Sequence, residues 1–76
     1  MVRTDLLKGE IARAGMSQSK LANMLGMSAK TFYSRMKKGI FNSNEIDAMV
    51  DLLRIENPVQ VFFAQKVANQ ETSNHI

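Results

Sequence analysis

The sequence predicts an all-α fold, a compact bundle of about five short helices. Three observations lead to this prediction. Apolar residues recur at spacings of three and four along most of the chain, as they do on the buried face of a helix. Glycine, serine and asparagine interrupt these stretches at positions typical of helix ends. The length of 76 residues suffices for only one small hydrophobic core.

The first helix is expected at residues 5–14. Leu7 and Ile11 lie one turn apart and should face the core. Thr4 is in place to cap the start of this helix, and Gly15 follows its last apolar residue, where a left-handed residue commonly ends a helix.

Two further helices are expected at residues 18–25 and 29–38, separated by a very short connection. Ser28 can cap the second of them. Ala22 is small where the two helices must cross, and Gly26 can adopt the positive φ of a tight turn. Apolar residues that should fill the angle between these helices and their neighbours are Leu21, Leu25, Met27, Phe32 and Met36.

A fourth helix is expected at residues 43–54. Its cap is either Asn42, with Glu45 completing a capping box, or Ser43. Its core-facing residues are expected to be Ile46, Met49, Val50 and Leu53.

Asn57 and Pro58 predict the start of a short fifth helix, with Asn57 as its cap. The pattern over residues 59–67 also allows a short extended piece after about Phe63. Phe62 and Phe63 suit either the core or a subunit contact. We expect one domain over residues 1–67, followed by a disordered tail at residues 68–76. The candidate dimer contacts are Val59, Val61, Phe62 and Phe63.

Composition excludes several classes of protein and of site. The chain has no cysteine and only one histidine, so we expect no disulfide, no metal and no other cofactor. No apolar run approaches the roughly 18 residues of a membrane span, and the first residues lack the apolar stretch of a secretory signal. Because no catalytic constellation is present either, we do not expect an enzyme.

The charge is unevenly distributed along the chain. Residues 1–40 carry eight basic and two acidic residues, whereas residues 41–76 carry two basic and five acidic ones. Such an asymmetry favours an anionic partner, and nucleic acid is the first candidate, although solvated lysines alone can also produce it.

The region from residue 17 to residue 39 resembles the Cro/CI-type helix-turn-helix regulators, in particular the small phage repressor-like proteins. The residues that match their pattern are Gln18, Leu21, Ala22, Gly26 and Ser28. The resemblance extends over about residues 4–63. It implies a lambda-repressor-like bundle of five helices, double-stranded DNA as the ligand and a homodimer that binds a palindromic operator. The helix at residues 29–38 begins with Ala29 and Lys30 where family members often have glutamine, so no base preference follows from the family.

The helix at residues 29–38 is the expected recognition helix. A helix of this length can enter a major groove, which is about 12 Å wide. The residues expected to contact bases are Ala29, Lys30, Tyr33 and Ser34. Candidate phosphate contacts are Gln18, Lys20, Ser28, Arg35, Lys37 and Lys38. The plainer interpretation of the same residues is an ordinary solvated helix face.

The sequence therefore predicts a sequence-specific DNA-binding regulator, a repressor of phage or prophage type, in the cytoplasm of a bacterial host and without membrane contact. The alternative is an antirepressor-like module that binds a partner repressor. In that case Tyr33 and Met36 would be presented to the protein partner.

Overall fold

The computed structural model describes residues 2–63, which form helices and no strand. The all-α prediction is therefore confirmed. The helices are α1 (Thr4–Arg13), α2 (Gln18–Met24), α3 (Ala29–Lys38), α4 (Ser43–Leu53) and α5 (Pro58–Phe62). The expected tail at 68–76 and the extended alternative beyond Phe63 lie outside the described residues.

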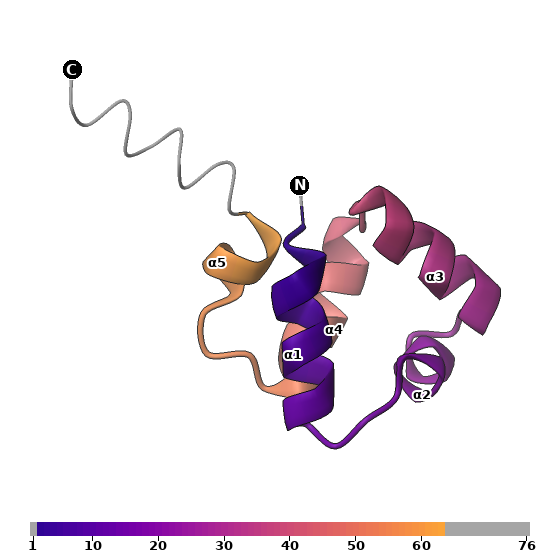
Figure 1. Cartoon of the computed structure of the whole chain (residues 1–76), viewed down its shortest axis with the longest axis horizontal. Coiled ribbons are helices and arrows are strands. Elements are labelled where there is room, and N and C mark those ends of the chain that lie inside the picture. The colour runs from indigo at the N-terminus through magenta and orange to yellow at the C-terminus, as the bar shows by residue number, and fades with distance from the viewer. Residues whose placement is uncertain (1, 64–76) are drawn as a thin grey trace.

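Helices α1 and α4 form the centre of the fold, and α3 lies at its edge. Figure 1 shows α5 on one side of this pair and α2 with α3 on the other. Helix α2 packs on α3, and α1 packs on both α2 and α5. This arrangement leaves α3 with a neighbour on its inner side and none of the other helices on its outer side.

Four helices begin at a polar side chain that accepts a backbone hydrogen bond. Ser17 Oγ accepts from Lys20 N–H at 3.1 Å, and Ser28 Oγ accepts from Thr31 N–H at 3.1 Å. The remaining two caps are Asn42 on α4 and Asn57 on α5. Asn42 and Glu45 form a reciprocal capping box, so the alternative cap Ser43 is wrong.

Helix α1 begins one residue earlier than expected, at Thr4, so the prediction of Thr4 as a cap is also wrong. The residue before it, Arg3, occupies the cap position without a side-chain hydrogen bond. The reason is tertiary: Val2 N–H donates to the carbonyl of Gly39 at 3.0 Å, and Arg3 N–H donates to the carbonyl of Val61 at 2.7 Å. These two bonds hold the chain entering α1, so the helix starts where they end.

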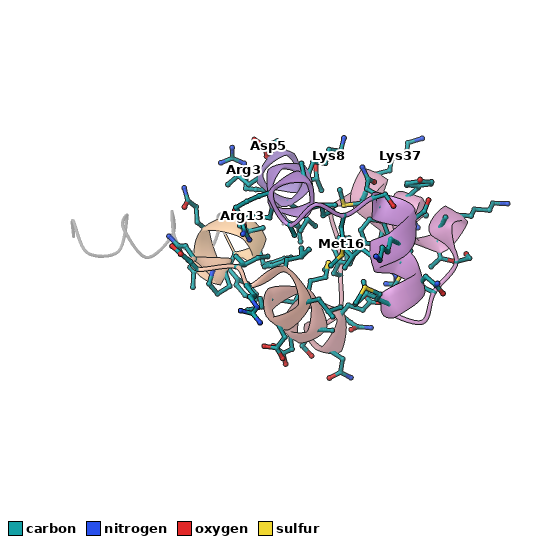
Figure 2. The ribbon with its side chains drawn as sticks, turned by 90° about the horizontal axis from the view of Figure 1, so that it is seen from below. Arg3, Asp5, Lys8, Arg13, Met16 and Lys37 are labelled. Carbon is teal, nitrogen blue, oxygen red and sulfur yellow. The ribbon has the colours of Figure 1, made fainter. Side chains whose placement is uncertain are left out.

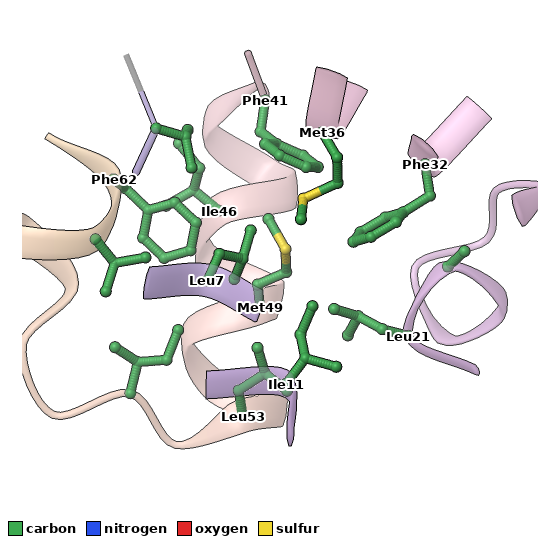
Figure 3. Packing of buried hydrophobic residues seen from close by; sticks show 14 residues of the cluster. Leu7, Ile11, Leu21, Phe32, Met36, Phe41, Ile46, Met49, Leu53 and Phe62 are labelled. Atoms are coloured by element: carbon green, nitrogen blue, oxygen red, sulfur yellow. The ribbon is translucent and has the colours of Figure 1, made fainter. Parts of the chain in front are cut away.

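The core is a single cluster between the helices, and Figure 3 shows its packing. Leu7 of α1 and Met49 of α4 are fully buried at its centre. The expected core residues that the structure buries are Leu7, Ile11, Leu21, Ala22, Phe32, Met36, Ile46, Met49 and Leu53. Leu25, Met27 and Val50 were expected there too, but they are only partly buried and pack against the rim of the cluster.

Val61 and Phe62 are corrections to the predicted dimer contacts. They are 5% and 2% exposed, so their side chains belong to the core of the same chain and cannot reach a partner. Helix α5 is short and docks on α1, which turns both residues inward. Val59 and Phe63, in contrast, are 47% and 40% exposed.

Phe41 is a core residue that the sequence pattern did not identify. It lies between α3 and α4, so it belongs to no helical repeat. Its ring packs against that of Phe32 with centroids 5.7 Å apart. This aromatic pair anchors the inner side of α3 to the segment that leads into α4 (Figure 3).

Candidate nucleic-acid interface

The turn between α2 and α3 is built on one alanine and one glycine. Ala22 is fully buried on the side of α2 that carries α3, and its carbonyl accepts a hydrogen bond from Met27 N–H at 3.0 Å. Gly26 has a φ of 77°, a left-handed conformation that residues with a Cβ adopt at a cost. Together they let α3 start directly after α2 and pack against it, which is the geometry of a helix-turn-helix.

The outward face of α3 carries the residues expected to contact bases. Phe32 and Met36 point into the core and thereby set the rotation of the helix about its axis. Lys30, Tyr33 and Ser34 are consequently exposed. The fourth candidate, Ala29, is half-buried, so less of it is accessible than expected.

Met36 bears on the alternative in which this face binds a partner protein. That alternative required Tyr33 and Met36 to be presented together. Tyr33 is 49% exposed, but Met36 is only 6% exposed and fills the core. Of the two residues expected for the protein-binding alternative, Tyr33 is therefore presented on the surface and Met36 is not.

Tyr33 is linked to α2 through Ser19, a residue that the sequence pattern did not single out. The Tyr33 hydroxyl and Ser19 Oγ lie 3.1 Å apart and share a hydrogen bond. Because this bond joins an exposed side chain of α3 to the first turn of α2, it restricts where the tyrosine ring can lie. Sequence spacing gives no sign of this contact, since the two residues belong to different helices.

Arg35 behaves differently from the other expected phosphate contacts. Its Nε lies 3.3 Å from Oε2 of Glu45, so the guanidinium is paired with α4. Its side chain is 36% exposed, and that of Glu45 is 12% exposed. The other carboxylate oxygen of Glu45 accepts a hydrogen bond from Asn42 N–H at 2.9 Å. One carboxylate thus serves both the capping box of α4 and the ion pair with α3.

Two hollows flank α3 and collect most of the expected contact residues. The hollow facing α1, about 490 Å³, is lined by Thr4, Lys8, Gln18, Tyr33, Met36 and Lys37. The hollow on the opposite flank, about 570 Å³, is lined by Lys30, Thr31, Ser34, Arg35, Lys38 and Ile40. We call them the α1-side hollow and the far-side hollow. Lys20, in the first turn of α2, and Ser28, the cap of α3, line neither hollow, and both are exposed.

The charges around α3 are almost all positive. Within the helix there are four basic residues and no acidic one, whereas α4 carries three acidic residues. In α1 each acid is paired with an arginine: Asp5 with Arg3 at 2.8 Å and Glu10 with Arg13 at 2.7 Å. The side-chain hydrogen bond from Arg3 lowers the pKa of Asp5, so this carboxylate stays charged and paired.

Lys8 is the functional candidate that sequence reasoning missed. The helical repeat of α1 places it on the outer side, where a lysine is unremarkable. Only the packing of α1 beside α3 brings it to the hollow that Lys37 also lines. Figure 2 shows both side chains along the same edge of the molecule.

Residues 2–63 contain no group of three or more side chains that could hold a metal ion. Over the same residues no helix is both long and apolar enough to cross a membrane.

Comparison with known proteins points to the same three helices. The model of the family described as bacterial regulatory protein, Fis family, matches residues 5–39, which contain α1, α2 and α3. No curated protein and no solved structure matches the chain. The match does not extend to the Cro/CI type, which stays a prediction. Over its first three helices the chain is similar to the Fis family, and this similarity supports a DNA-binding transcriptional regulator of the helix-turn-helix kind.

Proposed function

We propose that this chain is a sequence-specific DNA-binding repressor of phage or prophage type that places α3 in the major groove. The observation that carries the proposal is the division of α3 into two sides. Phe32 and Met36 are buried, while Lys30, Tyr33 and Ser34 are exposed on a helix without an acidic residue. A ten-residue helix is about 15 Å long, which suits a groove about 12 Å wide.

Base selection would come from the exposed polar groups of α3. The Lys30 ammonium can donate to O6 and N7 of guanine, and the Ser34 hydroxyl can donate or accept. The Tyr33 ring offers an apolar surface next to its hydroxyl, which Ser19 already engages. The half-buried methyl of Ala29 would contact a thymine methyl only at its exposed edge.

Phosphate contacts would hold the helix in register. Lys37 and Lys38 follow the recognition residues on α3, and both are exposed. Gln18 and Lys20 in the first turn of α2 and Ser28 at the cap of α3 are further candidates for phosphate contacts. Arg35 is a weaker candidate than expected because Glu45 already pairs with it.

Repression would follow from occupancy, because a protein bound across a promoter excludes polymerase. One helix reads only a few base pairs, each worth about 1–3 kcal/mol, which does not single out one site in a genome. A homodimer with half-sites one helical turn apart doubles the readout. Val59 and Phe63 are the exposed apolar residues that support this assembly. The site of action would be the cytoplasm of the bacterial host.

The direct test is selection of bound duplexes from a random pool, followed by titration of the selected duplex between 50 and 200 mM salt. We expect one enriched motif with two related half-sites. If about six phosphates are neutralised, affinity should fall by about 10³ over this range. A chain that binds no duplex at low salt would overturn the proposal. Binding without any enriched motif would remove sequence recognition from it.

A further inference from the structure

We propose that Lys8 of α1 and Lys37 of α3 together hold a single DNA phosphate in the α1-side hollow. This inference rests on the proposed function and adds a contact from a helix outside the helix-turn-helix. Both lysines line the hollow, as do Gln18 of α2 and Tyr33 of α3. The site is therefore assembled from three helices, and no single stretch of sequence contains it.

The charge of the hollow suits an anion. None of its lining residues is acidic. The two acids of α1, Asp5 and Glu10, are each occupied by an arginine. Neither Lys8 nor Lys37 has a side-chain hydrogen bond or ion pair within residues 2–63. Two ammonium groups without a local counter-charge thus border one hollow.

The hydrogen-bonding groups suit a phosphate in particular. A phosphodiester offers two unesterified oxygens that accept from ammonium, amide and hydroxyl donors. Gln18, whose side-chain amide is such a donor, lines the hollow beside the two lysines. The Tyr33 hydroxyl already shares a hydrogen bond with Ser19 Oγ, so we assign it no contact with the phosphate.

The position of the hollow identifies the phosphate as one of the DNA backbone. Tyr33 and Lys37 belong both to the hollow and to the outward side of α3. A helix in the major groove is bordered on both sides by phosphates, and the α1-side hollow lies along one such border. The far-side hollow, with Lys30 and Lys38, lies along the other.

The first experiment measures the affinity of the full chain for the selected duplex after single charge removals. We expect Lys8→Gln to weaken binding by up to about fivefold at low salt, as for one exposed ion pair. The matched control is Arg54→Gln, which removes one charge from the exposed C-terminal cap of α4. This control should leave affinity unchanged. Thermal melting of both variants verifies that the fold is intact.

The second experiment places a neutral methylphosphonate at one backbone position at a time in that duplex. Wild type should lose affinity at several positions. For both Lys8→Gln and Lys37→Gln, the methylphosphonate should no longer reduce affinity at one position of the duplex, and this position should be the same for both variants. If the two variants lose sensitivity at different positions, or if Lys8→Gln keeps the wild-type profile, the shared phosphate is wrong. Failure of wild type to bind any duplex would instead overturn the proposed function.

Discussion

Single side chains determine how α3 is held and what it offers to a partner. Phe32 and Met36 orient the helix from the inside, and Glu45 holds Arg35 from the neighbouring helix. The side chains of Phe32, Met36 and Arg35 are held by these contacts and are therefore not free to contact a partner. Lys30, Tyr33 and Ser34 remain exposed on the helix, and they are the base contacts that we propose.

Removal of either available side chain should change specificity without unfolding the protein. For Lys30→Ala and Ser34→Ala we expect loss of preference at individual base pairs, worth about 1–3 kcal/mol each. Repeated duplex selection with each variant measures the change. Identical motifs from wild type and both variants would remove α3 from base reading. Their melting temperatures should match that of wild type, because both side chains are exposed.

Glu45 allows its two roles to be separated by substitution. In Glu45→Gln the amide oxygen can still accept from Asn42 N–H, so only the charge pairing with Arg35 is lost. We expect the free energy of unfolding to fall by less than about 1 kcal/mol. Glu45→Ala also removes the cap partner and should cost about 1 kcal/mol more. Denaturant titration compares the two; equal losses would contradict the dual role.

The helices themselves depend on backbone conformations that only some residues tolerate. Gly9 lies inside α1 on the exposed side, and Gly26 lies in the turn with a φ of 77°. A Cβ built at either position meets no atom within 4 Å. The two sites therefore differ in backbone conformation and not in available space.

Alanine substitutions at these two glycines should have opposite effects. Gly9→Ala should stabilise α1 by about 0.5–1 kcal/mol, because alanine loses less conformational freedom in a helix. Gly26→Ala should destabilise by about 1–2 kcal/mol, since the left-handed conformation strains a Cβ. Each 1 kcal/mol corresponds to a shift of about 4–8 °C in melting temperature. Shifts of the same sign in both variants would contradict this account of the turn.

The packing of α2 on α3 depends on the small size of Ala22. Its side chain is fully buried, so Ala22→Leu must displace neighbouring groups. We expect a loss of about 1–3 kcal/mol in the free energy of unfolding. The measurement is a denaturant titration with Gly9→Ala as a reference for an accessible site. A leucine variant as stable as wild type would show that the crossing has spare room.

Across the whole molecule, the two ends present different surfaces. One end carries the basic α3 with its two hollows, and the other carries α5 with exposed Val59 and Phe63. In Figure 1 these two helices lie on opposite sides of α1. The surfaces that we propose for DNA binding and for the dimer contact therefore lie on separate parts of the chain.

Substitutions of the buried Phe62 and of the exposed Val59 and Phe63 distinguish the core residues of α5 from its proposed dimer surface. Phe62→Ala should cost about 3–5 kcal/mol and unfold much of the protein, because the side chain is 2% exposed. Val59→Ser with Phe63→Ser should leave the monomer folded and abolish the dimer that we propose. Sedimentation velocity measures the assembly, and circular dichroism measures the fold. A doubly substituted chain that remains dimeric would exclude this surface as the contact.

The sequence alone determined the helices, the caps Ser28 of α3 and Asn57 of α5, and the turn between α2 and α3. These features are local: a cap or a turn depends on groups a few residues apart, and a buried helix face repeats every three to four residues. The expected range of α3, Ala29–Lys38, agrees with the structure for this reason.

Only the tertiary structure decided which residues meet across helices. It turned Val61 and Phe62 into core residues, started α1 at Thr4 and paired Arg35 with Glu45. It also placed Lys8 at the hollow that Lys37 lines. None of these contacts can be inferred from the periodicity of the sequence. Each joins residues on different helices, and their distance depends on how the helices pack.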